Sequence, residues 1–353
     1  MNNKKDRLIV LWAEVMPYNV ACFRDFVSSG GEIDVYSWGE SKKLTPYDPP
    51  LIEGVRYFAE SDFSASEIIR KLHTSKPDLV VIVGRMEKKY LEVAKAARKM
   101  KIPVAGCADN QYTGDMRQII AKVFSRLLYR KYFDFMLVPG LYQYEYMRFL
   151  GFSRKQIKFP QYCADTTLFE KAYHARGKDF SQRDTILFTG RLLPIKGVDV
   201  LIDAFTDLVT EGFNGKLVLV GGGDGYKDRI DQDKIKCHGF LDQSEMLSLL
   251  PRVRVFCLPS RDEAWGLVIH EFTAAGLPVV TTQAVGASTA FVREGYNGFL
   301  ADQGDKESLK RSLKKVFALG EKEWLAFSDR SYELSRQITP ALWTSTVKSM
   351  MRC

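Results

Sequence analysis

The sequence predicts an α/β protein with two domains, each built on a parallel sheet covered by helices. Three observations support this fold class. The chain has 353 residues, 46% of them hydrophobic and 27% charged, so it is too long for one core and too apolar for disorder. Strand-length β-branched runs alternate with helical stretches, an order that builds parallel sheets covered on both faces. This order occurs twice along the chain.

The first series of elements covers the first 170 residues. Short β-branched runs bounded by polar turns predict its strands at 8–11, 33–36, 79–83 and 135–138. Between these strands, helices are predicted at 68–73 and 90–100.

The second series follows the polar, strand-free stretch Glu170–Asp184, which we interpret as a linker. Its strands are predicted at 186–189, 217–220, 235–237, 253–258 and 279–281, with a helix at 198–209. The result is two Rossmann-like domains, 1–170 and 171–334. Such sheets bind ligands at the carboxyl ends of their strands, so we expect the site in a cleft that both domains face.

Charge and cysteine usage narrow the class of protein. The net charge is +7 for residues 1–172 and +1 for the rest. A positive surface on the first half would attract nucleic acid, anionic membranes or phosphorylated substrates. The six cysteines form no CxxC pair, which indicates a reducing compartment and no structural zinc site. The apolar run Leu8–Ala13 is too short for a signal-peptide core or a membrane span, so we expect no segment that crosses a bilayer.

Two glutamates, Glu263 and Glu271, stand eight residues apart. If a helix begins near Trp265 or Gly266, Glu263 precedes it and Glu271 lies more than a turn inside, so the carboxylates would serve different ends of an elongated ligand. The amides of Gly266 and Leu267 would then lie at a helix N-terminus, which favours an anion or hydroxyls. Carboxylates accept hydrogen bonds from the vicinal hydroxyls of sugars and ribose. The alternative is that both glutamates are solvated helix residues.

Two cations, Arg191 and Lys196, lie between the strand at 186–189 and the next helix. They could clamp a diphosphate, Arg191 by paired hydrogen bonds and Lys196 as a point charge, or they could be exposed loop residues. The next strand is followed by Gly221, Gly222, Gly223 and Gly225. Because their spacing is not that of a dinucleotide-binding GxGxxG motif, we infer only a close approach of backbone to a ligand.

The second half of the chain resembles family 4 of the retaining glycosyltransferases, which have the GT-B fold. Seven motifs occur in family order over about 120 residues, a pattern too specific for chance. They are Gly190-Arg191-Leu192 with Lys196-Gly197, VGGGDG at 220–225, HGFL at 238–241, PS at 259–260, Glu263-x7-Glu271, AAGLPVV at 274–280 and EGYNGFL at 294–300. The resemblance implies that the segment 335–353 returns to the first domain.

The resemblance also implies roles for these residues. Arg191 and Lys196 would bind the donor diphosphate and help it to leave, Glu271 would hold the ribose, and Glu263 would hold the transferred sugar. Backbone would complete the donor site at Gly221, Gly222, Gly239, Phe240, Leu241, Trp265, Gly266 and Leu267. Members of the family need no metal. In the leading proposal for their mechanism, the leaving phosphate takes the acceptor proton, so no enzymic base is required. We therefore expect no cofactor, and a UDP- or GDP-sugar as the donor substrate.

Three segments depart from the family pattern. The usual Gly-Gly turn near the N-terminus is replaced by Glu14–Asn19, which puts a glycine cradle from this domain in doubt. Where many members have a histidine near the reacting sugar, the chain has Asp109 and Asn110; Asp109 is our candidate catalytic participant, with a turn-forming aspartate as the alternative. Ala264-Trp265 replaces Pro or Ser followed by Phe, so an aromatic remains.

One segment of the first domain could contact a membrane. Residues 117–131 predict a helix that carries cations beside an apolar face of Ile119, Ile120, Val123, Phe124, Leu127 and Leu128. The cations are Lys122, Arg126, Arg130 and Lys131. This helix could lie on an anionic membrane or pack its apolar face inside the domain. The tyrosine-rich stretch 141–152 favours the interfacial alternative.

Two further features are interpreted as structural. Asp231-Gln232-Asp233 spells the metal-holding triplet of a different transferase fold, but its place between a glycine loop and a strand indicates a solvated loop. The four histidines have no metal-ligand spacing, and we expect His270 to be structural.

We therefore expect a cytoplasmic glycosyltransferase of the hexosyltransferase type, bound peripherally to the inner face of the cell membrane. It would move a sugar to a hydroxyl of a glycan or lipid-linked acceptor in surface polysaccharide or lipopolysaccharide assembly, because anionic lipid carriers fit the basic first domain. The nearest alternative is a sugar-nucleotide epimerase of related fold. An alternative from another class is a non-catalytic nucleic-acid-binding protein, but no RNA or DNA module is recognisable.

Overall fold

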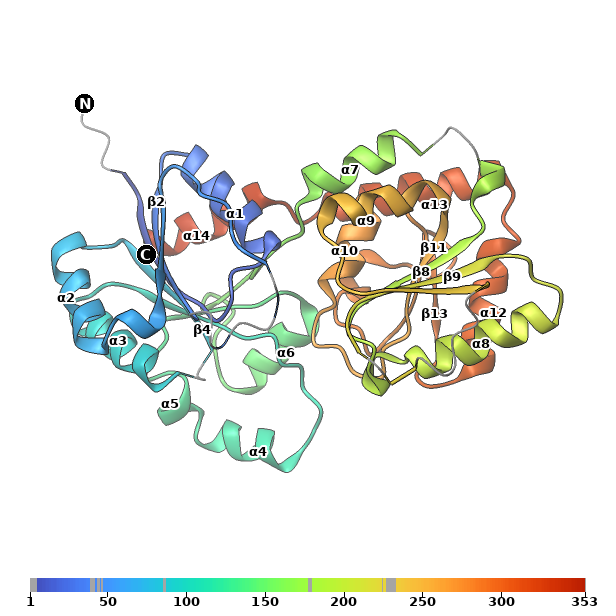
Figure 1. Cartoon of the computed structure of the whole chain (residues 1–353). Helices are drawn as coiled ribbons and strands as arrows, with labels where there is room; N and C mark the ends of the chain where they lie inside the picture. Colours follow the sequence, from blue (N-terminus) through green and yellow to red (C-terminus); the bar gives the residue numbers. More distant parts are fainter. Residues whose placement is uncertain are drawn as a thin grey trace. The chain divides into compact units, whose positions relative to one another are not determined.

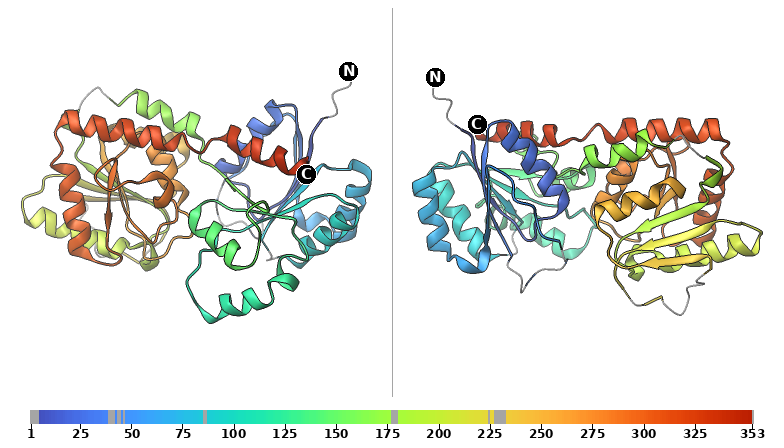
Figure 2. Two further views of the ribbon diagram at one scale, coloured as in Figure 1. Left: turned by 180° about the vertical axis from the view of Figure 1, so that it is seen from behind. Right: turned by 45° about the horizontal axis from the view of Figure 1, so that its top comes forward.

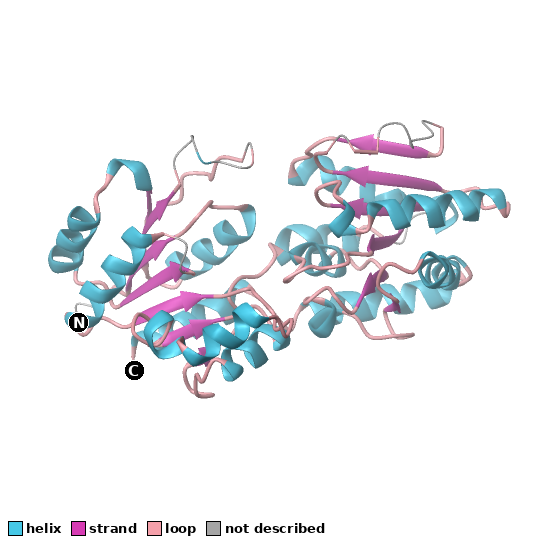
Figure 3. Ribbon diagram, turned by 90° about the horizontal axis from the view of Figure 1, so that it is seen from below, coloured by secondary structure: helices cyan, strands magenta, loops and turns pink. Residues whose placement is uncertain are grey.

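The computed structural model describes residues 5–38, 42, 45, 47–84, 87–176, 180–223, 225–226 and 233–352. The chain divides into two compact units, Met1–Asp165 with Ile338–Cys353, and Thr166–Gln337. Residues 166–170, assigned to the first domain from the sequence, therefore belong to the second unit, as do residues 335–337. Each unit contains one parallel sheet with helices on its faces, so the α/β fold class is confirmed (Figures 1 and 3).

The first unit is built on a seven-stranded sheet with the order β3-β2-β1-β4-β5-β6-β7. These strands are β3 (Val55–Ala59), β2 (Glu32–Ser37), β1 (Arg7–Leu11), β4 (Leu79–Val83), β5 (Val104–Cys107), β6 (Phe135–Leu137) and β7 (Ile157–Lys158). Val10 of β1 lies opposite Val35 of β2 and Val81 of β4. The direction of strand order reverses between β1 and β4, which makes that point of the carboxyl edge the expected ligand-binding position.

Helices bury the alternate side chains of this sheet on its two faces. On one face α1 (Pro17–Ser28) packs against α14 (Pro340–Met351), and on the other α2 (Ala65–Ser75) packs against α3 (Lys88–Lys99) (Figures 1 and 2). The Trp343 ring of α14 lies 6.2 Å from that of Phe23 and 6.4 Å from that of Phe26 in α1. Its Nε1 donates a hydrogen bond of 2.9 Å to the carbonyl of Gln161. The C-terminal helix is therefore part of this unit's core.

The segment predicted as one helix at 117–131 forms two, α4 (Met116–Val123) and α5 (Ser125–Leu128), separated by Phe124. No residue of α4 is buried, so the alternative in which its apolar face packs inside the domain is wrong. The less exposed side of α4 carries Gln118 and Ala121 instead. The tyrosine-rich stretch lies mostly in α6 (Leu141–Phe149), which buries Tyr146 and Met147 in the core.

The second unit is built on a six-stranded sheet with the order β10-β9-β8-β11-β12-β13. Its strands are β10 (Ile235–His238), β9 (Lys216–Val220), β8 (Thr185–Thr189), β11 (Val253–Leu258), β12 (Val279–Thr282) and β13 (Gly298–Ala301). All of the pairings are parallel, so every carboxyl end lies at one edge. The strand order reverses between β8 and β11.

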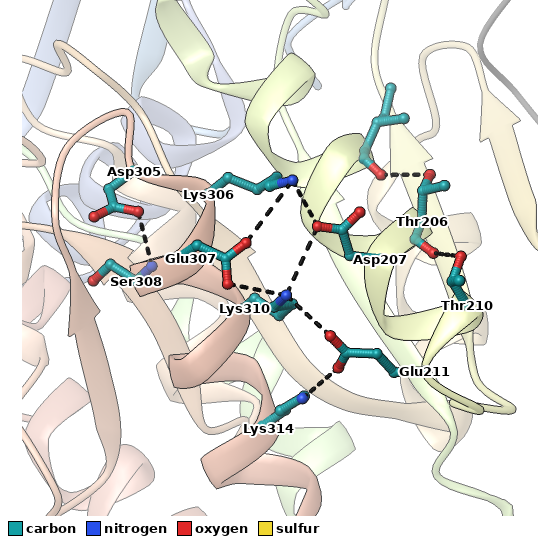
Figure 4. Close-up of polar contacts among 11 residues, drawn as sticks. Thr206, Asp207, Thr210, Glu211, Asp305, Lys306, Glu307, Ser308, Lys310 and Lys314 are labelled. Carbon is teal, nitrogen blue, oxygen red and sulfur yellow. Dashed lines mark hydrogen bonds and ion pairs between the residues drawn. The ribbon is translucent and has the colours of Figure 1, made fainter.

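The helices of this unit form two groups. The first group is α8 (Val198–Thr210) with α12 (Lys306–Phe317), and the second is α7 (Thr166–His174), α10 (Leu267–Ala274) and α13 (Glu321–Ser335). The shorter α9 (Gln243–Leu249) and α11 (Ser288–Phe291) follow β10 and β12. Ion pairs join α8 and its C-cap residue Glu211 to α12: the Lys306 ammonium lies 2.6 Å from the Asp207 carboxylate, and Lys310 lies 3.0 Å from Glu211 (Figure 4).

The interpretation of Glu170–Asp184 as a linker is wrong for its first residues, which belong to α7. Phe169 and Tyr173 are four residues apart and so share one helix face. Phe169 packs edge-on against Phe272 of α10, and Tyr173 stacks on Tyr332 of α13 at a centroid distance of 3.9 Å. These two ring contacts fold the beginning of the stretch onto the second unit.

Candidate functional site

The candidate site lies at the carboxyl edge of the second sheet, where the loops after β8 and β11 meet. The loop after β8 carries Arg191, which is exposed, and Lys196, which ends a single 3-10 turn (Pro194–Lys196). The loop after β11 carries Glu263. The ammonium of Lys196 and the carboxylate of Glu263 form an ion pair between the two loops, with the side chains 15% and 17% exposed. The structure thus brings together two residues predicted to bind one ligand.

Backbone hydrogen bonds hold Glu263 in place. Its amide donates to the carbonyl of Ala284 (3.3 Å), and its carbonyl accepts from the amide of Gly286 (3.1 Å). The neighbouring Trp265 is buried, and its carbonyl accepts from Ala287 (2.8 Å). The strand-like segment around Glu263 is therefore fixed to the loop that follows β12.

Helix α10 begins at Leu267, directly after Gly266, which agrees with the start predicted near Trp265 or Gly266. The first amides of a helix have no carbonyl of the preceding turn to bond, and they lie at the positive end of the helix dipole. Glu271 follows in the second turn and is half-buried. Glu263 and Glu271 thus lie on either side of a helix start, as the spacing predicts.

A second ion pair, missed by the sequence analysis, locks the same two loops together. Both terminal nitrogens of Arg261 donate to the Asp199 carboxylate at 2.7 Å, and Arg261 also bonds the carbonyl of Pro194. The Arg261 amide donates to the carbonyl of Ile195 at 2.8 Å. The Arg261 guanidinium lowers the pKa of Asp199 below its ordinary value. Arg261 stands between Ser260 and Glu263 of the motif, which is the signal that could have drawn attention to it.

Close backbone packing brings these loops into contact. Gly197 has a φ of +70°, and a Cβ there would lie 2.1 Å from the carbonyl oxygen of Pro259. A Cβ on Gly221 would lie 2.0 Å from the carbonyl oxygen of Gly190. The absence of a side chain at Gly221 is therefore required by the neighbouring loop, and the approach of its backbone to a ligand stays a prediction. Gly222, by contrast, faces open space.

The loop after β10 adjoins the same edge. The Gly221 amide bonds the carbonyls of His238 and Gly239, each at 3.1 Å. Phe240 is 53% exposed, and Leu241 is half-buried. The predicted backbone residues of the donor site therefore lie on adjoining loops.

His270 and the DxD triplet were both interpreted as structural. His270 is buried, stacks on Phe291 and forms a 2.9 Å hydrogen bond with the carbonyl of Ser335, which agrees with a structural role. Asp231 and Gln232 of the DxD triplet lie outside the described residues. Within the described part of the chain, no group of three or more His, Cys, Asp or Glu side chains is placed to hold a metal ion.

Asp109 lies in the first unit, just after β5, whose neighbours in the sheet are β4 and β6. Its side chain is exposed to solvent, yet packing of the surrounding protein near the carboxyl group raises its pKa. Burial, together with the negative charge of Asp109, raises the pKa of Tyr18, the second residue of α1. The sequence analysis singled out Asp109 but not Tyr18.

Comparison with known proteins assigns the second unit to a family. Residues 170–330 match the model of the glycosyl transferases group 1. This segment is a group 1 glycosyltransferase domain. The chain is also similar to the capsular polysaccharide biosynthesis glycosyltransferase CapM of Staphylococcus aureus. The two are 29% identical over 178 residues, 47% of this chain and 45% of CapM. The match thus spans less than half the length of this relative.

Solved structures show the fold of the whole chain around the glycosyltransferase domain. Anabaena HepE, solved in complex with UDP and glucose, is 17% identical with a TM-score of 0.70 over 97% of this chain and 99% of HepE. The lipopolysaccharide outer core galactosyltransferase WaaB is 14% identical with a TM-score of 0.67 over 98% of this chain and 99% of WaaB. The fold is GT-B, and the resemblance to glycosyltransferases is confirmed. Among the described helices, none is both long and apolar enough to span a bilayer.

Proposed function

We propose that the protein transfers a sugar from a nucleoside-diphosphate sugar to a hydroxyl of a glycan or lipid-linked acceptor, with retention of anomeric configuration. The observation that carries this proposal is the Lys196–Glu263 ion pair at the carboxyl edge of a group 1 glycosyltransferase domain. A mostly buried ammonium needs an anionic partner, and a mostly buried carboxylate needs donors. A nucleotide sugar supplies both, as phosphate oxygens and as sugar hydroxyls.

In this proposal, binding of the donor separates the ion pair between Lys196 and Glu263. Lys196 and the exposed Arg191 turn to the diphosphate, while Glu263 and the first amides of α10 bind the transferred sugar. Glu271 holds the ribose hydroxyls, and the loop at 238–241 meets the base. The bond from the anomeric carbon to the phosphate oxygen breaks as the acceptor oxygen attacks the same face. The acceptor proton passes to the leaving phosphate, whose charge the two cations stabilise without a metal or another cofactor.

We further propose that this reaction belongs to surface polysaccharide or lipopolysaccharide assembly, at the inner face of the cell membrane. CapM acts in capsular polysaccharide biosynthesis, and WaaB is a lipopolysaccharide galactosyltransferase, which supports this class of acceptor. The UDP and glucose bound by HepE support a UDP-sugar as the first donor to test. Asp109 is our candidate for a contact to the reacting sugar or the acceptor.

Calorimetry with a panel of UDP- and GDP-sugars tests the donor site. We expect Lys196→Ala and Glu271→Ala each to weaken binding of the preferred donor by about tenfold or more, since each removes a charged hydrogen bond. The matched controls, Lys322→Ala and Glu321→Ala, change exposed residues at the start of α13 and should leave affinity unchanged. Unchanged affinity in both site variants would overturn the assignment.

Product analysis separates transfer from the alternative functions. Incubation with donor alone should give at most slow hydrolysis, whereas an epimerised sugar nucleotide would identify an epimerase. Salt-sensitive binding of oligonucleotides by a protein that binds no donor would favour the nucleic-acid alternative. With an acceptor, NMR of the product should show the anomeric configuration of the donor.

A further inference from the structure

The first unit exposes a concentrated apolar surface on α4 and the residues that follow it. Within the described residues, fourteen large hydrophobic side chains are exposed, and six of these lie between residues 116 and 127. We call these six the α4 face: Met116 (69% exposed), Ile119 (40%), Ile120 (51%), Val123 (72%), Phe124 (49%) and Leu127 (60%). A concentration of exposed apolar side chains of this kind indicates a site of interaction.

The orientation of α4 is the reverse of that in an ordinary surface helix. Met116, Ile119, Ile120 and Val123 follow the i, i+3, i+4, i+7 spacing that normally points to a core, yet all four face solvent. Figures 1 and 2 show α4 standing away from the sheet of its own unit.

Polar contacts hold α4 in this orientation. The Asp115 side chain caps its first turn by accepting from the Gln118 amide (2.9 Å), and the Gln118 side chain bonds the carbonyl of Gln111 (2.8 Å). The Lys122 ammonium lies 4.4 Å from the ring centre of Phe149 in α6. The helix is therefore attached by its polar side, and its apolar side remains available.

The charge of this segment indicates the partner. Residues 116–131 contain five cations and no acidic residue. The cations are Arg117, Lys122, Arg126, Arg130 and Lys131, and none of them takes part in the ion pairs found among the described residues. An apolar strip beside this excess of cations complements acyl chains beneath anionic headgroups. Another protein surface of matching shape would not by itself require this excess of cations.

We infer that the α4 face docks on the surface of an anionic lipid bilayer, with its apolar side chains among the acyl chains and the cations at the lipid phosphates. This inference deepens the membrane location in the proposed function by naming the surface that makes the contact. The contact needs no donor and no catalysis, so it can be tested apart from sugar transfer.

Vesicle flotation with the full chain tests the inference. Wild-type protein should float with phosphatidylcholine vesicles that contain phosphatidylglycerol, and only weakly with phosphatidylcholine alone. Ile120→Glu with Val123→Glu should lower the bound fraction about tenfold, because two charges would enter the apolar layer. Arg117→Gln with Arg126→Gln should weaken binding to the anionic vesicles and reduce its salt dependence.

Matched substitutions elsewhere on the first unit serve as controls. Leu51→Glu changes a side chain that is 95% exposed, and Lys99→Gln with Lys101→Gln removes two exposed cations; both variants should float like the wild type. Circular dichroism and donor calorimetry should match the wild type in every variant, which separates loss of docking from loss of fold or of the proposed donor site. Failure of the wild type to float, or equal flotation of the Ile120/Val123 variant, would overturn the inference. A dimer in ultracentrifugation that this variant dissociates would also overturn it, by identifying a second copy as the occupant.

Discussion

We expect ionised Asp109 to lower the free energy of unfolding of the first unit. Since the surrounding protein raises its pKa, the folded state favours the protonated form more than the unfolded chain does. The protonated form carries no such cost at low pH. As pH rises through the raised pKa the carboxylate forms, and the stability associated with the protonated state is lost. We therefore expect Asp109 to lower the stability of the first unit at neutral pH.

Replacement of Asp109 by asparagine should expose this cost. We expect Asp109→Asn to raise the melting temperature at pH 7, and the gain should disappear as pH falls toward about 4, where an ordinary aspartate is itself protonated. The same variant should lower transferase turnover if Asp109 contacts the reacting groups. Thermal melts between pH 4 and 8 measure the first effect, with the exposed Asp62→Asn as control. A loss of stability at every pH would contradict this account.

Sequence spacing predicted that two candidate site residues lie close together, because simple geometry brings their loops to one edge. Lys196 and Glu263 follow strands of one parallel sheet, so their loops meet at one edge. The nearness of Tyr18 to Asp109 could not be predicted in this way. It depends on how α1 leaves its strand, which neither periodicity nor spacing encodes.

The 3-10 turn that ends at Lys196 and the loop after β11 behave as one element, because Arg261 bridges them to the start of α8. Its side chain bonds Asp199 and the carbonyl of Pro194, and its amide donates to the carbonyl of Ile195. These hydrogen bonds fix the position of Lys196 at the edge of the sheet. Arg261 is not among the residues that we propose to bind the donor. We therefore regard it as a positioning residue.

A double-mutant cycle tests this positioning role. Arg261→Met and Asp199→Asn should each raise the donor KM several-fold with a smaller effect on kcat, and the double variant should be no worse than either single variant, since one interaction is lost in all three. The stability change should stay near 1 kcal/mol, because both side chains are about a third exposed and water screens the pair. Losses that add in the double variant would show two independent roles.

Among the elements, strands with full β-branched runs were predicted closely, and marginal ones were missed. The predicted strand at 253–258 and the observed β11 coincide, because all six of its residues are buried. The strands β3, β5, β7 and β13 were not predicted: β3 is only partly buried, β7 has two residues, and β5 and β13 are short and contain a glycine. For α4 the sequence predicts an apolar stripe, but it does not show whether this stripe faces the core or solvent. The contacts of Gln118 and Lys122 decide this orientation.

Each of the two units has its own core, and the chain passes between them twice, after Asp165 and after Gln337. The second passage returns Ile338–Cys353 to the first unit, where Trp343, Val347 and Met350 are buried. The stability of the first unit therefore depends on Ile338–Cys353, which are far in sequence from the unit's other residues.

Truncation of Trp343 should reveal this dependence. Trp343→Ala removes the packing on Phe23 and Phe26 and the bond to Gln161, and should destabilise the first unit by about 3–5 kcal/mol. Hydrogen exchange followed by mass spectrometry should show faster exchange in β1, α1 and α14 and little change in β8 to β13. The exposed Ser345→Ala on the same helix is the control. Equal loss of protection in both units would show that they unfold as one.

The return of α14 also sets an order of events on the ribosome. Thr166–Gln337 is continuous, so it can close its core while translation proceeds. The core of the first unit stays incomplete, with Phe23 and Phe26 of α1 not yet covered by Trp343, until α14 leaves the exit tunnel. Nascent chains should therefore need chaperone protection longest at their oldest end, and a stalled translation product should contain a native second unit joined to an incomplete first one.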